Sequence, residues 1–264
     1  MQLDHLVINT RLGMDAAAEL FADLGFHLTP RGHHSLGSIN HLMMDPVSYL
    51  ELVGVPETGK QRQDVLDSPI GLSGLVFRAQ DARATCARLR DAGFAPQEPI
   101  LLERPVTLDG AEHMARFHNV RMTFAEFPVG RVYFCQHLTP DLVWRKEWLD
   151  HPNGFCGITG MRVQSPDPGA EAARYAMLAG GEAAQADGGW RVTGGGFALH
   201  ITEGADRFVD ATLAFETVEH IAARAEATGG AEWQPRGGGG VLTIPALGVT
   251  LHCHTTRSQT KDAK

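Results

Sequence analysis

The amino-acid sequence predicts an α+β fold: four βαβββ modules that pair into two curved, barrel-like mixed β-sheets with flanking helices. Three observations support this prediction. Short apolar runs rich in β-branched and aromatic residues have the length of strands. The first strand of each unit precedes an amphipathic helix that stops at glycine, which readily takes a positive φ at a helix C-terminus. The same order of elements then recurs along the chain, which is the sign of an internal repeat.

The physics of a single module explains why the modules should pair. One βαβββ unit leaves a face of its four-stranded sheet uncovered, whereas two units together curl eight strands around a cavity. The chain therefore divides into two halves and a connector, although the sequence leaves open which modules share a barrel. We expect a first half at 1–136, a connector at 137–155, a second half at 156–256 and a frayed tail at 257–264.

The first two units define the repeat. In the first, a helix at about 14–24 stops at Gly25, and we expect strands at 3–9, 26–29, 39–43 and 47–55. In the second, Asp81 is the expected N-cap of a helix at 83–92, and we expect strands at 71–79, 99–103, 116–125 and 131–136. The stretch 103–116 is longer than its counterpart and is interpreted as an insertion.

The second half repeats the order with helices at 168–178 and 218–227. Its strands are expected at 157–164, 183–186, 189–192, 197–202, 208–216, 232–234, 240–244 and 248–254. The glycine runs at 194–196 and 237–240 lack the Gly-Lys-Ser/Thr ending of a phosphate-binding loop. Hairpin turns explain these runs better.

Composition limits the classes of partner. The net charge of −8 argues against a nucleic-acid or anionic-membrane surface. No stretch approaches the ~20 apolar residues of a membrane span, and the N-terminus shows no signal sequence. The four cysteines form no CxxC pair, so we expect free thiols in the cytoplasm. A small-molecule substrate is the expected partner, and a homodimer is left open.

Glu51 is the most informative single residue, because it interrupts the apolar run Val47–Val55. Strand alternation places Glu51 on the same face as Tyr49 and Val53. A buried, unpaired carboxylate costs several kcal/mol, so a buried Glu51 requires a cation, a metal or a proton. The alternative is a charge on the exposed face of a strand.

Several stretches resemble glyoxalase-like domain proteins of the vicinal oxygen chelate superfamily, which includes glyoxalase I and extradiol dioxygenases. They are 3–8 (LDHLVI), 32–42, 49–52 (YLEL), 134–140 (FCQHLTP), 144–145 and 151–154. The resemblance implies a metal-dependent enzyme of lyase, isomerase or dioxygenase type, acting on a small oxygenated substrate in a barrel cavity. The alternatives are a metal-free small-molecule-binding or resistance protein, and a metal-free hydrolase or lyase that uses the histidines around 33–41 as base.

The resemblance also implies site residues. A divalent metal (Fe, Mn, Zn, Ni or Co) would be bound by His5 and Glu51, with His137 as the third ligand, because Gly74 stands where the second first-strand histidine is expected. His200 and His252 near the ends of the second-half modules are alternative ligands. Glu51, His41 and His34 are the expected catalytic residues, as general base or substrate clamp.

Overall fold

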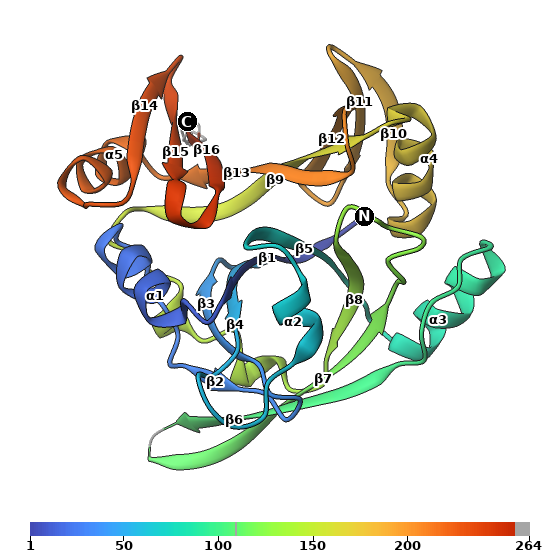
Figure 1. Cartoon of the computed structure of the whole chain (residues 1–264), viewed down its shortest axis with the longest axis horizontal. Coiled ribbons are helices and arrows are strands. Elements are labelled where there is room, and N and C mark those ends of the chain that lie inside the picture. The colour runs from blue at the N-terminus through green and yellow to red at the C-terminus, as the bar shows by residue number, and fades with distance from the viewer. Residues whose placement is uncertain (109, 257–264) are drawn as a thin grey trace, which may run out of the picture.

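The computed structural model describes residues 1–108 and 110–256 (Figure 1). The tail expected at 257–264 lies outside the described residues. In the first half, two βαβββ units follow one another, with a short extra helix between them. The elements are β1 (Leu3–Arg11), α1 (Met14–Asp23), β2 (Gly32–His33), β3 (Ile39–Met44), β4 (Tyr49–Gly54), α2 (Gln63–Asp67), β5 (Gly71–Arg78), α3 (Ala82–Asp91), β6 (Ile100–Leu108), β7 (Ala111–Arg121) and β8 (Arg131–His137).

These strands form one eight-stranded mixed sheet with the order β2-β3-β4-β1-β5-β8-β7-β6. The two first strands of the modules, β1 and β5, are antiparallel neighbours, and each pairs in parallel with the closing strand of its own module, β4 or β8. The sheet curls until its two edges meet, and the Ser35 amide just after β2 donates to the Glu103 carbonyl of β6 at 3.1 Å. Figure 1 shows the resulting nearly closed ring.

The second half repeats this topology. Its elements are β9 (Phe155–Ser165), α4 (Pro168–Ala179), β10 (Glu182–Ala186), β11 (Gly189–Gly194), β12 (Phe197–Glu203), β13 (Arg207–Phe215), α5 (Val218–Ala227), β14 (Glu232–Arg236), β15 (Gly239–Ile244) and β16 (Val249–Thr255). The order β10-β11-β12-β9-β13-β16-β15-β14 matches that of the first sheet strand for strand. This sheet stays open in Figure 1, with its hairpins pointing away from the first half.

The largest hydrophobic core lies between the two sheets. It combines buried residues of both halves, such as Leu6, Phe77, Val163 and Leu213. The four long helices close the sides of this layer, with α1 beside α5 and α3 beside α4 in Figure 1. A second, smaller core lines the inside of the first ring and includes Val7 and Tyr49. The first half therefore has two buried faces, which explains why nearly every residue of β1 is buried.

Local sequence signals set the helix ends as predicted. The Asp81 side chain accepts a hydrogen bond from the Ala84 amide at 2.8 Å and caps α3. Gly25 follows α1 with φ of 81°, and Gly180 ends α4 with φ of 68°. The two glycine runs form the turns of the β11–β12 and β14–β15 hairpins, as expected.

One expected strand is wrong. Residues 26–29 form no strand, because Pro30 lacks an amide proton and only the Thr29 amide reaches the Leu42 carbonyl, at 2.9 Å. The stretch expected to be longer than its counterpart lies in the β6–β7 hairpin, whose pairing runs from Ile100–Asn119 to Leu108–Ala111, whereas the corresponding β2–β3 hairpin pairs only two residues from each strand. The helix α2 was not predicted, since its five residues are too few to show a helical period.

Other features bear on the classes of protein considered above. None of the described helices is long and apolar enough to cross a membrane. All four cysteines are free thiols. The connector ties back to the first half, because His151 Nε2 contacts the Met44 carbonyl at 2.7 Å and the Asn153 amide group donates to the Leu24 carbonyl at 3.0 Å.

Candidate functional site

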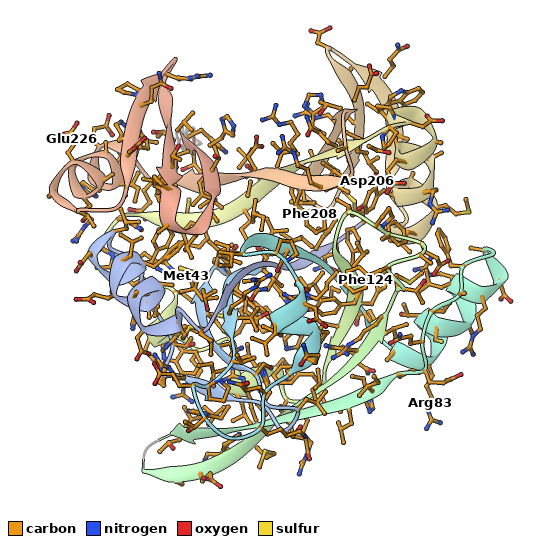
Figure 2. The ribbon with its side chains drawn as sticks, viewed as in Figure 1. Met43, Arg83, Phe124, Asp206, Phe208 and Glu226 are labelled. Carbon is orange, nitrogen blue, oxygen red and sulfur yellow. The ribbon has the colours of Figure 1, made fainter. Side chains whose placement is uncertain are left out.

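The ring of the first sheet encloses a small polar cavity of about 40 Å³. Figure 2 shows how densely side chains fill the interior of this sheet. The cavity walls come from the inward-facing rows of several strands, which is why residues far apart in sequence meet there. Its polar lining residues are His5, His34, Asn40, Glu51, Arg62, Arg104, Asn119, Arg131 and Tyr133.

His5 and Glu51 face each other across this cavity. The His5 Nε2 atom lies 3.6 Å from the Glu51 Oε2 atom, and both side chains are buried. The His5 ring stacks on Tyr49 with 4.4 Å between ring centroids, and the Tyr133 hydroxyl lies 3.0 Å from Nε2. Parallel pairing of β1 and β4 produces this meeting, since it sets His5 opposite Tyr49 two residues before Glu51. The two residues to which the sequence pointed first thus share one hollow.

Asp4 holds the other ring nitrogen of His5. Its Oδ1 atom lies 2.6 Å from His5 Nδ1, and its two oxygens also contact His137 Nε2 at 3.0 and 3.1 Å and Arg78 Nε at 3.0 Å. Burial alone would raise the pKa of Asp4, but the charges and hydrogen bonds of His137 and His5 outweigh it and hold this pKa far below its usual range. An ionised Asp4 accepts a hydrogen bond from Nδ1 and fixes the orientation of the ring, so Nε2 is the nitrogen that faces the cavity.

Sequence reasoning missed Asp4, because strict alternation assigns it to the face opposite His5. The β1–β5 pairing shifts register between Leu3 and His5, and this irregularity allows neighbouring side chains to meet. The available signal was the pair of an aspartate next to a histidine inside an apolar strand.

Glu51 is not on the wet face of its strand. Its side chain is buried, and its Oε1 atom accepts a hydrogen bond from Asn40 Nδ2 at 2.7 Å. The Asn40 Oδ1 atom is buried and finds no hydrogen-bond partner within the described part of the chain. Glu51 and Asn40 therefore offer two acceptor atoms, Oε2 and Oδ1, that are free for a ligand.

His137 does not join His5 and Glu51. Its Nε2 atom contacts Asp4 instead and lies 3.7 Å from the Cys135 sulfur. Among the described residues, Asp4, Cys135 and His137 are the one group of three or more metal-ligating side chains with mutually close ligand atoms. Burial raises the pKa of the Cys135 thiol, and the Asp4 oxygens already accept three hydrogen-bonding partners. This group is a hydrogen-bonded network that supports His5.

Gly74 is explained by its neighbour across the strand pair. It lies opposite Val7, and a Cβ atom at position 74 would fall 2.8 Å from the Val7 Cγ2 atom. Val7 thus occupies the space in which a second first-strand histidine would project. The ligand set that the resemblance implies loses this member for steric reasons.

The two other predicted catalytic histidines differ in position. His34 lines the cavity and its Nδ1 atom contacts the Ser38 hydroxyl at 3.0 Å. His41 pairs with Leu52 across β3 and β4 and so lies on the sheet face opposite Glu51, where Arg31 donates to it at 3.1 Å. The structure therefore brings His34, and not His41, to the site.

Burial lowers the pKa of His34 to about 4, which links this residue to stability. The neutral ring stabilises the fold above the unfolded pKa of 6.5, and this contribution is lost as pH falls toward 4. Between pH 7 and 5 we expect the wild type to lose about 1–2 kcal/mol more unfolding free energy than His34→Gln. Urea unfolding at the two pH values measures this difference, and equal losses in both proteins would contradict it.

His200 and His252, the alternative ligands, lie in the second sheet on β12 and β16. They line a separate cleft of about 470 Å³, where the His252 Nε2 atom is 3.4 Å from the Asp210 carboxylate. β16 pairs with β13 and β15, so the first and fourth modules do not share a barrel. Neither histidine can therefore join His5 and Glu51.

The donor set does not complete a metal site. His5 and Glu51 could supply two ligands, whereas catalytic sites such as those of zinc usually take three from the protein. Burial and the nearby Glu51 raise the pKa of Tyr133, so its phenol stays protonated and is a poor ligand. Arg104 and Arg131 also line the cavity and disfavour a further cation.

Comparison with solved structures shows the fold of the whole chain. A hypothetical protein from Staphylococcus aureus has a TM-score of 0.70 at 12% identity, covering 97% of this chain and 99% of its own. The Mn(II)-bound glyoxalase from Novosphingobium aromaticivorans gives 0.61 at 13% identity, covering 96% and 81%. A mutant of 4-hydroxymandelate synthase from Streptomyces coelicolor gives 0.55 at 11% identity, covering 96% and 92%.

The paired βαβββ modules of this chain therefore have the same fold as these solved structures. The chain belongs to the family described as Glyoxalase-like domain, whose sequence model matches residues 3–179. A search of curated protein sequences finds no match. The resemblance noted from the sequence is thus confirmed at the level of fold and family.

Proposed function

We propose that this protein is an enzyme that moves a proton on a small oxygenated substrate, in a lyase or isomerase reaction, within the cavity of the first sheet. The observation that carries the proposal is the buried pair of His5 Nε2 and Glu51 Oε2, 3.6 Å apart, with Asp4 bound to the far side of the imidazole. A histidine oriented by a buried carboxylate is a recurring arrangement for a general base.

Each side chain of the site has a role in this reaction. Asp4 keeps the His5 proton on Nδ1, so that Nε2 can take a proton from the substrate, and it stabilises the imidazolium that forms. Tyr133 keeps its proton because its pKa is raised, and its hydroxyl, which contacts His5 Nε2 at 3.0 Å, can turn its proton to a developing oxyanion once Nε2 is protonated. The imidazolium of His5 then returns the proton to the substrate, at the same atom or at a neighbouring one, and the Glu51 carboxylate, held by Asn40 and 3.6 Å from Nε2, stabilises the charge of the imidazolium in the meantime.

The experiment is a proton-exchange assay in D₂O. The protein is incubated with 2-hydroxy and 2-oxo carboxylates, and loss of the signal of the proton on the carbon next to the carbonyl or hydroxyl is followed by NMR. We expect enzyme-dependent exchange for at least one substrate. Saturable ligand binding without any exchange would instead support a small-molecule-binding protein of the same fold.

Metal dependence is tested in the same assay. Because the site supplies only two ligands, we expect protein purified without chelator to contain no stoichiometric Fe, Mn, Zn, Ni or Co, and EDTA to leave exchange unchanged. Exchange that EDTA abolishes and one of these metals restores would support the metal-dependent enzyme predicted from the resemblance. His5 and Glu51 would then be the residues that hold the ion.

A further inference from the structure

Four arginines surround the proposed site, and their charges exceed those of the acids beside them. Arg104 belongs to the inward-facing row of β6, where the positions two residues either side, Leu102 and Val106, are buried and apolar. The other three are Arg62, Arg121 and Arg131. An arginine in such a row is costly unless something pairs with it, because burial of a charge is expensive.

The acids in the lining are used by other partners. Glu51 faces His5 and accepts from Asn40, whereas Asp64 binds Arg62 through two hydrogen bonds of 2.6 Å each. Arg121 approaches the same Asp64 only at 4.0 Å. Counting these side chains, the lining carries two more positive than negative charges with histidine neutral.

Specific nitrogen atoms are left without partners. Arg104 Nη2, Arg121 Nη2 and Arg131 Nε are buried and have no hydrogen-bond partner within residues 1–108 and 110–256. Burial lowers the pKa of all three guanidinium groups, the positive charge of Arg62 adds to this lowering at Arg121 and Arg131, and the nearby carboxylates Glu51 and Asp64 offset it only in part. Buried polar groups in native proteins are usually satisfied, so three orphaned donors around two adjoining cavities indicate a missing acceptor.

The chain makes room for these groups. Gly32 lies beside them, and a Cβ atom there would fall 2.9 Å from Arg104 Nη1 and 2.3 Å from Asn40 Oδ1. Any larger residue at this position would push the guanidinium or the amide aside. The arginine is therefore accommodated by the backbone.

The cavity that holds His5 and Glu51 is too small for a whole substrate, but a second one adjoins it. The outer cavity has a volume of about 360 Å³, and Arg62, Arg131 and Tyr133 line both. Phe124, which is about half exposed and is labelled in Figure 2, lies in the outer lining with Arg121. A ligand spanning both cavities would meet Arg104 inside and Arg121 outside, with Arg131 between them.

We infer that the substrate of this site is a small dianion, with one oxyanion group for Arg104 in the inner cavity and another for Arg121 and Arg131 in the outer one. Carboxylate and phosphate groups share the geometry that a guanidinium binds through two hydrogen bonds. Two such groups would balance the excess charge and supply acceptors for the orphaned donors. Calling this dianion a substrate rests on the proposed function, whereas its binding can be tested without any reaction.

The experiment measures binding of malonate and of phosphoglycolate to the full chain by calorimetry and thermal shift, at constant ionic strength. Acetate serves as the monoanion and dimethyl malonate as the neutral analogue. We expect saturable binding of malonate or phosphoglycolate, weaker binding of acetate and none of the diester. Tighter binding of phosphoglycolate, whose phosphate brings its charge to between about −2.5 and −3 near pH 7, indicates that one of the two bound groups is a phosphate, and the opposite order indicates two carboxylates. No binding of either compound beyond the NaCl control would overturn the inference.

Three variants distinguish recognition of the anionic groups by particular arginines from attraction by the overall positive charge of the site. Arg104→Met is expected to weaken dianion binding about 10- to 100-fold and to leave or raise the ligand-free Tm, since it removes an unpaired buried charge. Arg131→Lys keeps the charge but loses the planar fork, and it should bind more weakly than wild type. Arg116→Gln, whose side chain is exposed and bound to Glu103, is the matched control and should bind as wild type. Unchanged binding in Arg104→Met, or a lowered Tm, would contradict the inference.

The binding and exchange assays together distinguish failure of this inference from failure of the proposed function. His5→Gln should still bind the dianion while losing proton exchange. If the wild-type protein bound the dianion but exchanged no proton on any substrate, the proposed enzyme would be refuted and the ligand class would stand. If the protein exchanged a proton on a neutral substrate but bound no dianion, the proposed enzyme would stand and the inferred ligand class would be refuted.

Discussion

Replacing Asp4 by alanine is expected to lower the free energy of unfolding by about 3–5 kcal/mol. Asp4 is fully buried and is the common partner of His5, His137 and Arg78. Removing it leaves the Arg78 charge and two imidazoles without their acceptor, and a buried network broken on one side costs more than it contributed when intact. Urea unfolding followed by circular dichroism measures the loss.

Two control variants give this expectation its specificity. Asp15→Ala removes an aspartate whose side chain is 84% exposed and paired with Arg31, and we expect a change within about 0.5 kcal/mol. Asp4→Asn keeps the shape and removes only the charge. If Asp4→Ala were as stable as Asp15→Ala, the hydrogen-bonded network around Asp4 would contribute nothing to the free energy of unfolding.

The low pKa of Asp4 also predicts how the stability of the protein changes with pH. Its folded pKa lies below the unfolded value of 3.8, so its contribution is complete above about pH 4 and disappears as the solution becomes more acidic. This window lies below that of His34, and the two residues can be separated in one series of pH values.

Replacing His5 by glutamine is expected to reduce proton exchange by about 10²–10⁴-fold, the usual contribution of a positioned general base. Glutamine can still hydrogen-bond to Asp4 and Tyr133, so the fold should survive while the proton acceptor is lost. The measurement is the NMR exchange assay, together with a thermal melt of the variant.

The control for His5 is His220→Gln, since this histidine lies on the exposed side of α5, far from the first ring in sequence and fold. Its exchange rate should equal that of wild type. A His5→Gln protein that exchanges at the wild-type rate would remove His5 from the reaction. Glu51→Gln tests the other member of the pair in the same assay. Loss of exchange would place the reaction at Glu51 in the first sheet, and unchanged exchange would point to the other sheet.

The fold was accessible from the sequence because its signals are local and repeated. Helices end at Gly25 and Gly180, which take a positive φ, and α3 begins at Asp81, whose side chain caps it. Each of these signals depends on one residue and its immediate neighbours. The element that failed, at 26–29, depends on how far pairing can continue before Pro30, which is a property of two strands and not of one. Repetition also fixed the module order, although it could not show which modules share a sheet.

The site was only half accessible. The sequence pointed to His5 and Glu51 because the resemblance carries positions within a module over to this chain, and the structure places both in one cavity. Asp4 depends on a register shift, and the choice of His34 over His41 depends on which row of a strand faces inward. The arginine set comes from four separate segments of the chain, so no window of sequence contains it. Tertiary structure was needed to bring these residues together.

The seam of the first ring has a consequence for the geometry of the buried pair. At this seam β2 contributes only two residues, and the Ser35 amide supplies a hydrogen bond to the opposite edge. His5 and Glu51 stand away from this seam, on β1 and β4, which pair in parallel from His5–Tyr49 to Asn9–Val53. Loosening of the seam would therefore leave the spacing of His5 and Glu51 unchanged, because that spacing is set by the pairing of β1 with β4 and not by closure of the ring.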